Sequence, residues 1–215
     1  HLHLALEPRD VRAHHVLAHV FEMTERFDEG VRFMRGTLGA WETGSTATTH
    51  CWWHLALLHL GRGEVASAFA IYDASIRPAK GASINDLVDA SSLLWRLRLL
   101  GIDDPARWAP VAEAWRPHVG DAFSSFNDLH AMLAFAGARD RASARMLLER
   151  LADAGQRPSR HGASTRSLGL PAARAVDAFA RADHELAVRI LADIAPRARG
   201  FGGSKAQRDV LYLTL

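Results

Sequence analysis

The chain has 215 residues, 48% of them hydrophobic and 23% charged, and its 26 basic and 24 acidic side chains give a formal charge of +2. This composition is typical of a globular protein in water and excludes a disordered or collagen-like chain. No apolar run approaches the roughly 20 residues that a membrane-spanning helix needs. No block of about five or six like charges marks a surface for nucleic acid. We therefore expect neither a membrane nor a nucleic-acid partner.

A single cysteine, Cys51, cannot form an internal disulfide and cannot build a cysteine-based zinc site. A reducing compartment suits such a chain, so we expect a cytoplasmic location. The chain opens on His1 instead of methionine and stops inside the apolar segment 210–215. These two ends lead us to expect a fragment of a longer protein.

Alanine, leucine and arginine dominate the periodic segments, and the alternation expected of strands persists nowhere, which predicts an all-α protein. A helix, a short polar turn and a second helix recur along the chain at a nearly constant interval. The predicted helix pairs cover residues 11–40, 48–77, 84–116, 123–153 and 171–195, and a further first helix begins at residue 204. Ser204 is the expected N-cap of that last helix.

Small residues recur where two paired helices must approach each other closely. These predicted contact positions are Ala18, Gly30, Ala56, Ala68 and Ala142. Glycine, proline and serine between the pairs predict loops at residues 81–85, 117–121 and 156–165. Stacked pairs of this kind form a curved, right-handed α-α superhelix with an inner face of first helices. We expect one such domain over residues 1–215.

Four segments carry a resemblance to a known family. They are His-Val-Leu-Ala-His-Val at 15–20, Cys-Trp-Trp-His-Leu-Ala-Leu at 51–57, Phe-Asn-Asp-Leu-His-Ala-Met at 126–132 and Gly-Gly-Ser-Lys-Ala-Gln-Arg-Asp at 202–209. The chain resembles the tetratricopeptide-repeat protein 38-like family over nearly its whole length. It departs from the family pattern at Cys51, where asparagine is expected, and at Lys205, where histidine is expected. The resemblance implies a tetratricopeptide-like fold and no particular activity.

Two histidine pairs recur with the spacing of one helical turn. His15 and His19 project from one face of the first helix, and His50 and His54 repeat this spacing in the next pair. They could line a groove with ordinary hydrogen bonds, or they could bind zinc or iron with carboxylates from Asp128 or Asp209. We interpret them as groove residues and predict no metal and no cofactor.

Trp52 and Trp53 are adjacent on a helix, so their side chains point about 100° apart. We expect Trp52 to pack between helices and Trp53 to face the groove, where an indole offers a stacking surface. Core packing is the alternative for both.

In the fourth pair, Asn127, Asp128 and His130 form a polar cluster at a helix start. Asp128 could orient His130, or a histidine of the groove, as a general base requires. Asn127 and Asp128 could equally serve only to cap the helix.

The start of the last helix is unusually polar. Arg208 could hold an anionic ligand together with Ser204 and the amides that follow Gly202 and Gly203. An ion pair between Arg208 and Asp209 is the structural alternative.

From these observations we expect His15, His19, His54, Asn127 and His130 to converge on one inner-face pocket. The first hypothesis is a tetratricopeptide-like module that binds a peptide segment or an intramolecular lid in this groove. The alternative is an enzyme or small-molecule binder that uses the same residues in a closed pocket. No phosphate-binding loop, dinucleotide fingerprint or nucleophile elbow supports a standard enzyme class, and the sequence leaves the oligomeric state open.

Overall fold

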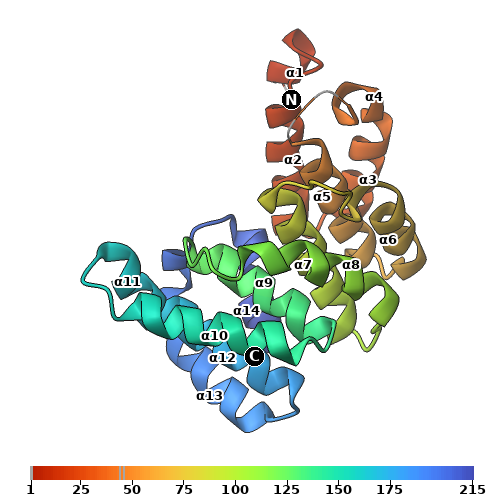
Figure 1. Ribbon diagram of the computed structural model, residues 1–215. Helices are drawn as coiled ribbons and strands as arrows, with labels where there is room; N and C mark the ends of the chain where they lie inside the picture. The colour runs from red at the N-terminus through yellow and green to blue at the C-terminus, as the bar shows by residue number, and fades with distance from the viewer. Residues whose placement is uncertain (1, 44, 46) are drawn as a thin grey trace. The chain divides into compact units, whose positions relative to one another are not determined.

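The computed structural model describes residues 2–43, 45 and 47–215, and within these residues the chain is helical and contains no strand. This confirms the all-α prediction. The chain divides into two compact units. We call them unit 1, which ends at Arg77, and unit 2, which begins at Pro78. The colours of Figure 1 run from red to yellow over unit 1 and from yellow-green to blue over unit 2.

Unit 1 is built on two helix hairpins. Asp10 accepts hydrogen bonds from the backbone N–H groups of Arg12 and Ala13 and thereby caps the first helix of the first hairpin. The helices of unit 1 are α1 (Leu2–Leu6), α2 (Val11–Met23), α3 (Phe27–Gly36), α4 (Leu38–Trp41), α5 (Thr48–Gly61), α6 (Val65–Ile71) and the π-helical turn η1 (Tyr72–Ile76). Helix α5 packs against α2, α3 and α6. It is therefore the central helix of the unit.

Close helix contacts in unit 1 depend on small residues. Ala18, Ala56 and Ala68 are completely buried. A Cβ atom built on Gly30 would lie 2.7 Å from Leu58 and 2.9 Å from Phe21, so a larger residue does not fit without movement. These four predicted contact positions are confirmed as buried.

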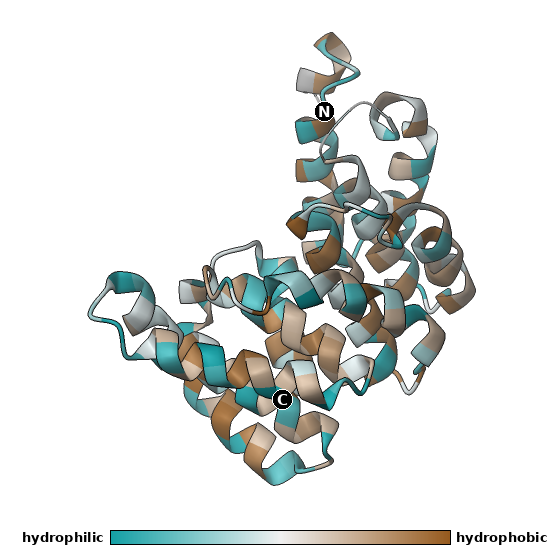
Figure 2. Ribbon diagram, viewed as in Figure 1, coloured by the Kyte–Doolittle hydropathy of each residue, from teal (hydrophilic) through white to brown (hydrophobic). Residues whose placement is uncertain are grey.

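Unit 2 continues with three more hairpins and a final helix. Its helices are α7 (Ile84–Leu99), α8 (Pro105–Trp115), the 3-10 turn η2 (Arg116–His118), α9 (Ser125–Gly137), α10 (Arg141–Gly155), α11 (Arg160–Ser164), the π-helical turn η3 (Thr165–Gly169), α12 (Leu170–Ala180), α13 (His184–Ile194), the 3-10 segment η4 (Ala195–Phe201) and α14 (Lys205–Thr214). Helix α9 packs against α7, α8, α10 and α12, and α14 packs against α7. In Figure 2, hydrophobic and hydrophilic residues alternate along the outer helices of this unit, as amphipathic helices require.

The helix bounds agree with the predicted pairs, but two details were wrong. Ala142 is exposed, and the first buried positions of α10 are Ser143, Ala144 and Leu147. The buried contact residue is Ala144, which is the fourth residue of α10 as Ala68 is the fourth residue of α6, so the predicted frame was two residues too early in this pair. The predicted loop 156–165 contains α11, because Ser159 accepts a hydrogen bond from the Gly162 N–H and starts a helix there.

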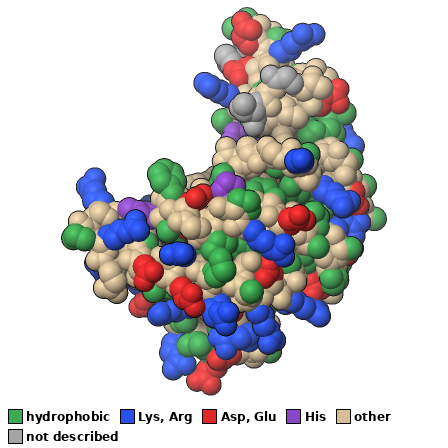
Figure 3. Space-filling model, viewed as in Figure 1, with side chains coloured by type: hydrophobic (Ala, Val, Ile, Leu, Met, Phe, Trp, Pro, Cys, Tyr) green, Lys and Arg blue, Asp and Glu red, His purple; other side chains and the backbone are tan. Residues whose placement is uncertain are grey.

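The surface of unit 2 carries both signs of charge. Figure 3 shows acidic and basic side chains intermixed over the face that it presents. None of the helices in the described part of the chain combines the length and the apolar character needed to cross a membrane.

Candidate functional site

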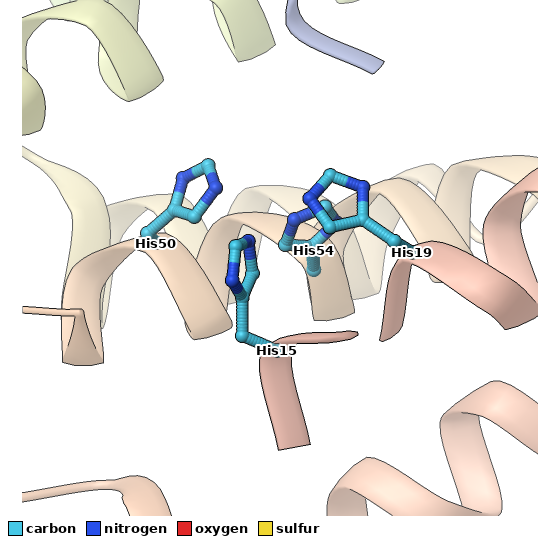
Figure 4. A group of neighbouring side chains, drawn as sticks. All are labelled: His15, His19, His50 and His54. Atoms are coloured by element: carbon cyan, nitrogen blue, oxygen red, sulfur yellow. The ribbon is translucent and has the colours of Figure 1, made fainter. Parts of the chain in front are cut away.

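Four histidines of unit 1 meet where α2 packs against α5. We call His15, His19, His50 and His54 the histidine cluster. One potential ligand nitrogen from each lies within 4.8 Å of those of the other three. The closest pair of ring centroids, His19 and His54, is 4.2 Å apart, and the widest pair, His19 and His50, is 6.5 Å apart. Figure 4 shows the rings gathered around one point from two helices.

The cluster favours neutral imidazoles. Burial, followed by the positive charges that His50 and His19 would carry, lowers the pKa of His15 to about 4. Burial and His50 also lower the pKa of His19. The Nε2 atom of His15 is buried and has no hydrogen-bond partner. At neutral pH the two α2 histidines therefore present lone pairs and carry no charge.

Glu22 orients one member of the cluster. The Nδ1 atom of His54, which is completely buried, lies 3.1 Å from the Glu22 carboxylate. A proton on Nδ1 donates to this carboxylate and leaves the lone pair on Nε2. We did not predict Glu22 from the sequence, although it follows His15 and His19 at helical spacing on the same face of α2.

The tryptophan prediction was wrong. Trp53 is completely buried, while Trp52 is only partly buried and contacts Trp41 edge to face at 4.9 Å. Trp53 stacks on His50 with ring centroids 5.1 Å apart and an angle of 11° between the rings. Because α5 is covered on most sides by α2, α3 and α6, Trp53 forms a wall of the histidine cluster and offers no surface to a ligand.

Unit 2 contains a separate pocket with a volume of about 600 Å³. We call it the α9 pocket, because three of the residues that line it lie in the first two turns of α9. It is lined by Ile84, Asn85, Trp115, His118, Asp121, Phe123, Ser124, Asn127, Asp128 and Ala131. The sequence predicted Asn127 and Asp128 but missed the others. Apart from Ala131 of α9, these come from the end of α8, the segment that follows it and the start of α7.

Asp128 is the most unusual group of the α9 pocket. Its side chain is 5% exposed, and its Oδ2 atom has no hydrogen-bond partner. Burial, followed by the negative charge of Asp121, raises the pKa of Asp128 to about 7. Asp121 itself accepts a hydrogen bond from His118 at 2.9 Å. Asp128 therefore changes charge near neutral pH.

Asp128 does not orient His130. The Nδ1 atom of His130 donates to the Phe126 carbonyl at 2.7 Å, and Phe126 also packs on the ring with centroids 4.4 Å apart. Full burial lowers the pKa of His130 to about 4. The cap alternative was also wrong, because α9 begins after Ser124 and no side chain caps its first amides.

Arg208 and Asp209 line another pocket of unit 2, with Arg199, Lys205 and Tyr212 and a volume of about 570 Å³. Arg208 donates to the carbonyls of Gly202 at 3.1 Å and Gly203 at 2.5 Å. Ser204 caps α14 as predicted, and Gln207 accepts from the Ser204 N–H at 2.9 Å in a capping box. At the start of α14, Ser204 and Arg208, which were expected to bind an anion, therefore already make hydrogen bonds within the chain.

The structure brings the predicted residues together in three groups. His15, His19, His50 and His54 meet in unit 1, with Trp53 beside them. Asn127 and Asp128 share the α9 pocket of unit 2, and Arg208 and Asp209 share the pocket at α14. Convergence of the unit 1 histidines with Asn127 and His130 on one pocket stays a prediction.

Comparison with known proteins adds no assignment. No protein-family model matches the chain, and no solved structure matches it significantly.

Proposed function

We propose that the chain is a tetratricopeptide-like repeat protein, of the kind found in the tetratricopeptide-repeat protein 38-like family, which binds a peptide segment. The proposal includes a right-handed superhelix of helix pairs and a cytoplasmic location. It rests on the hairpin repeat and on the four sequence segments that resemble the family. Helical repeats serve mostly as binding surfaces, which is an analogy at the level of the fold.

The binding site in this proposal is the α9 pocket. From the sequence we expected Trp53 and His54 to line the binding groove. Both side chains are completely buried, so a bound peptide could make little contact with them. Asp128 carries the proposal: a carboxyl that is 5% exposed and has an unpartnered oxygen lies in the wall of a pocket. An unpartnered buried polar atom costs about 1–3 kcal/mol. A ligand that donates a hydrogen bond to Oδ2 removes this cost.

The pocket's chemistry selects an amine or guanidinium next to an apolar group. Asp121 and Asp128 provide negative charge, while Ile84, Ala131 and Phe123 provide apolar contact. Phe123 is 80% exposed. A peptide with a lysine or arginine beside an aromatic or aliphatic residue matches both features, and a volume near 600 Å³ suits one or two side chains.

A second candidate function is an enzyme or small-molecule binder that uses Asp128. A carboxyl with a pKa of about 7 inside a pocket is suited to general acid or base catalysis. His118 is the imidazole in the pocket wall, but its Nδ1 is held by Asp121 at 2.9 Å. Peptide binding is the better supported candidate because this bond already occupies the imidazole of the pocket wall.

The test is binding of an arrayed library of short peptides to the full chain. We expect selection of basic residues beside apolar ones. Asp128→Asn should weaken a selected peptide about tenfold or more, since hydrogen bonds to charged groups contribute about 1.5–3 kcal/mol. Asp153→Asn, at an exposed position of α10, is the matched control.

The same peptide should bind more tightly as pH rises through about 7, because ionised Asp128 attracts the cation. Equal binding of a peptide in which norleucine replaces lysine contradicts the proposal. Equal weakening by Asp128→Asn and Asp153→Asn also contradicts it.

A further inference from the structure

The histidine cluster of unit 1 lies outside the α9 pocket and has a different chemistry. Two histidines of α2 and two of α5 each stand four residues apart, so each helix offers a pair of imidazoles on one face. Pairs of ligands on facing helices are a common way to build a metal site in helical proteins. Figure 4 shows the two pairs directed toward each other.

The four nitrogens are close to the spacing that a metal ion needs. A tetrahedral zinc ion with Zn–N distances of about 2.0–2.1 Å holds its ligands about 3.3 Å apart. The potential ligand atoms already lie within 4.8 Å of one another. Small rotations about the side-chain torsions of His15, His19 and His50, which are only partly buried, can bring them closer without moving either helix.

The surroundings of the cluster resemble the outer shell of a metal site. Histidines that bind metals commonly donate their second ring N–H to a carboxylate, which fixes the tautomer and strengthens the ligand. Glu22 stands 3.1 Å from Nδ1 of His54 in this role. Trp53 stacks on His50 and contacts His54, with ring centroids 5.1 and 4.9 Å apart. It thereby restricts both rings.

Two other histidines of the same helices show how a structural histidine is held. His14 on α2 is bonded through Nδ1 to the Asp10 carbonyl at 2.9 Å and stacks on Phe33. His59 on α5 is bonded through Nδ1 to Glu64 at 2.5 Å. Each stands alone among non-histidine partners. Core packing therefore accounts for His14 and His59, but it does not account for four imidazoles around one point.

We propose that His15, His19, His50 and His54 bind one transition-metal ion, Zn²⁺ in first place, which joins α2 to α5. Four neutral nitrogen ligands suit the borderline ions and not Mg²⁺ or Ca²⁺, which require oxygen. Two pairs on two helices surround the ion, whereas Cu²⁺ prefers a planar arrangement. With four protein ligands the site is closed, and its role is structural.

The experiment uses the full chain without an affinity tag, stripped of metal and then titrated with ZnCl₂ in competition with a chromophoric chelator. We expect one Zn²⁺ per chain. Titration with CoCl₂ should give the intense visible absorption of a four-coordinate ion. Weak absorption of a six-coordinate ion, or less than one Zn²⁺ per chain, overturns the proposal.

Variants separate the cluster from nonspecific binding. His15→Gln and His50→Gln each remove one ligand and should lower the affinity for Zn²⁺ by more than about 100-fold. Loss of an outer-shell partner alone lowers metal affinity by about 10–100-fold. His184→Gln, at an exposed position of α13, is the control and should bind like the parent chain. Unchanged affinity in His15→Gln, or an equal loss in His184→Gln, overturns the proposal.

Glu22→Gln keeps all four ligands and tests the outer shell if a ligand variant fails to fold. It should weaken Zn²⁺ by about 10–100-fold and leave the cobalt spectrum four-coordinate. Unchanged Zn²⁺ affinity in this variant contradicts the role of Glu22.

Discussion

Units 1 and 2 are both built from helix hairpins, but their buried polar side chains are arranged differently. Unit 1 gathers four histidines at one helix contact. Unit 2 separates its polar groups. His130 is held by a backbone carbonyl, Trp115 donates to Ser91 at 2.9 Å, and Asp128 lies in a pocket wall with an unpartnered oxygen. Helix hairpins can therefore hold two unlike groups of buried polar side chains, because each group depends on a few side chains and not on the hairpin itself.

The largest expected effect concerns the pH dependence of stability in unit 2. The pKa of Asp128 is raised from 3.8 to about 7, so the folded chain keeps a proton that the unfolded chain releases above about pH 4. Protonated Asp128 therefore contributes to the free energy of unfolding. This contribution is complete below about pH 4 and is lost as the pH rises to 7. The loss amounts to about 1.4 kcal/mol for each unit between the two pKa values.

Asp128→Asn removes this dependence. Relative to the parent chain, the variant should become more stable by several kcal/mol between about pH 4 and pH 7. Urea unfolding at a series of pH values measures the difference. A difference that stays constant with pH shows that Asp128 has the same pKa in the folded and unfolded chains.

The next effect tests helix packing in the two units. Ala56 is completely buried in unit 1, whereas Ala142 is exposed in unit 2. Ala56→Leu should overpack the helix contact and cost about 1–3 kcal/mol. Ala142→Leu should stay within about 0.5 kcal/mol of the parent chain. Chemical denaturation of both variants measures this, and equal costs would show that the repeat places these two residues alike.

The smallest effect concerns helix caps in unit 2. Ser204 accepts from the Gln207 N–H at 3.2 Å, while Ser124 makes no side-chain cap bond at the start of α9. Ser204→Ala should therefore cost about 1 kcal/mol, and Ser124→Ala should cost less. Thermal unfolding compares the two, and a larger loss in Ser124→Ala contradicts this assignment of the caps.

The helix pairs could be predicted from the sequence because helical periodicity and small contact residues are local signals. Ala18 and Ala56 were identified in this way, while Ala142 was misplaced by two residues because the interval between helix pairs is not constant. The histidine cluster was only half predictable. Helical spacing pairs His15 with His19 and His50 with His54, but their meeting depends on the register between α2 and α5, which tertiary packing sets.

The α9 pocket was less predictable than the histidine cluster. Asp128 was singled out for its position at a helix start, but its burial depends on how α9 packs against α7 and α8, which local sequence signals do not show. Phe123 and Asp121 lie in a connecting loop, and no periodic signal marks a loop residue as part of a site. Trp53 was misassigned because helical position alone does not show which faces of α5 are covered.

The proposed function depends most directly on the Asp128 carboxyl, which lies in the α9 pocket and would bind a basic ligand. A carbon-13 NMR titration of the full chain measures this carboxyl directly, with Asp128→Asn to identify its resonance. We expect a midpoint near pH 7 for the chain alone and a clearly lower midpoint with a saturating lysine-containing peptide, since a nearby cation favours the ionised form. A midpoint near 4, or one that the peptide leaves unchanged, would contradict it.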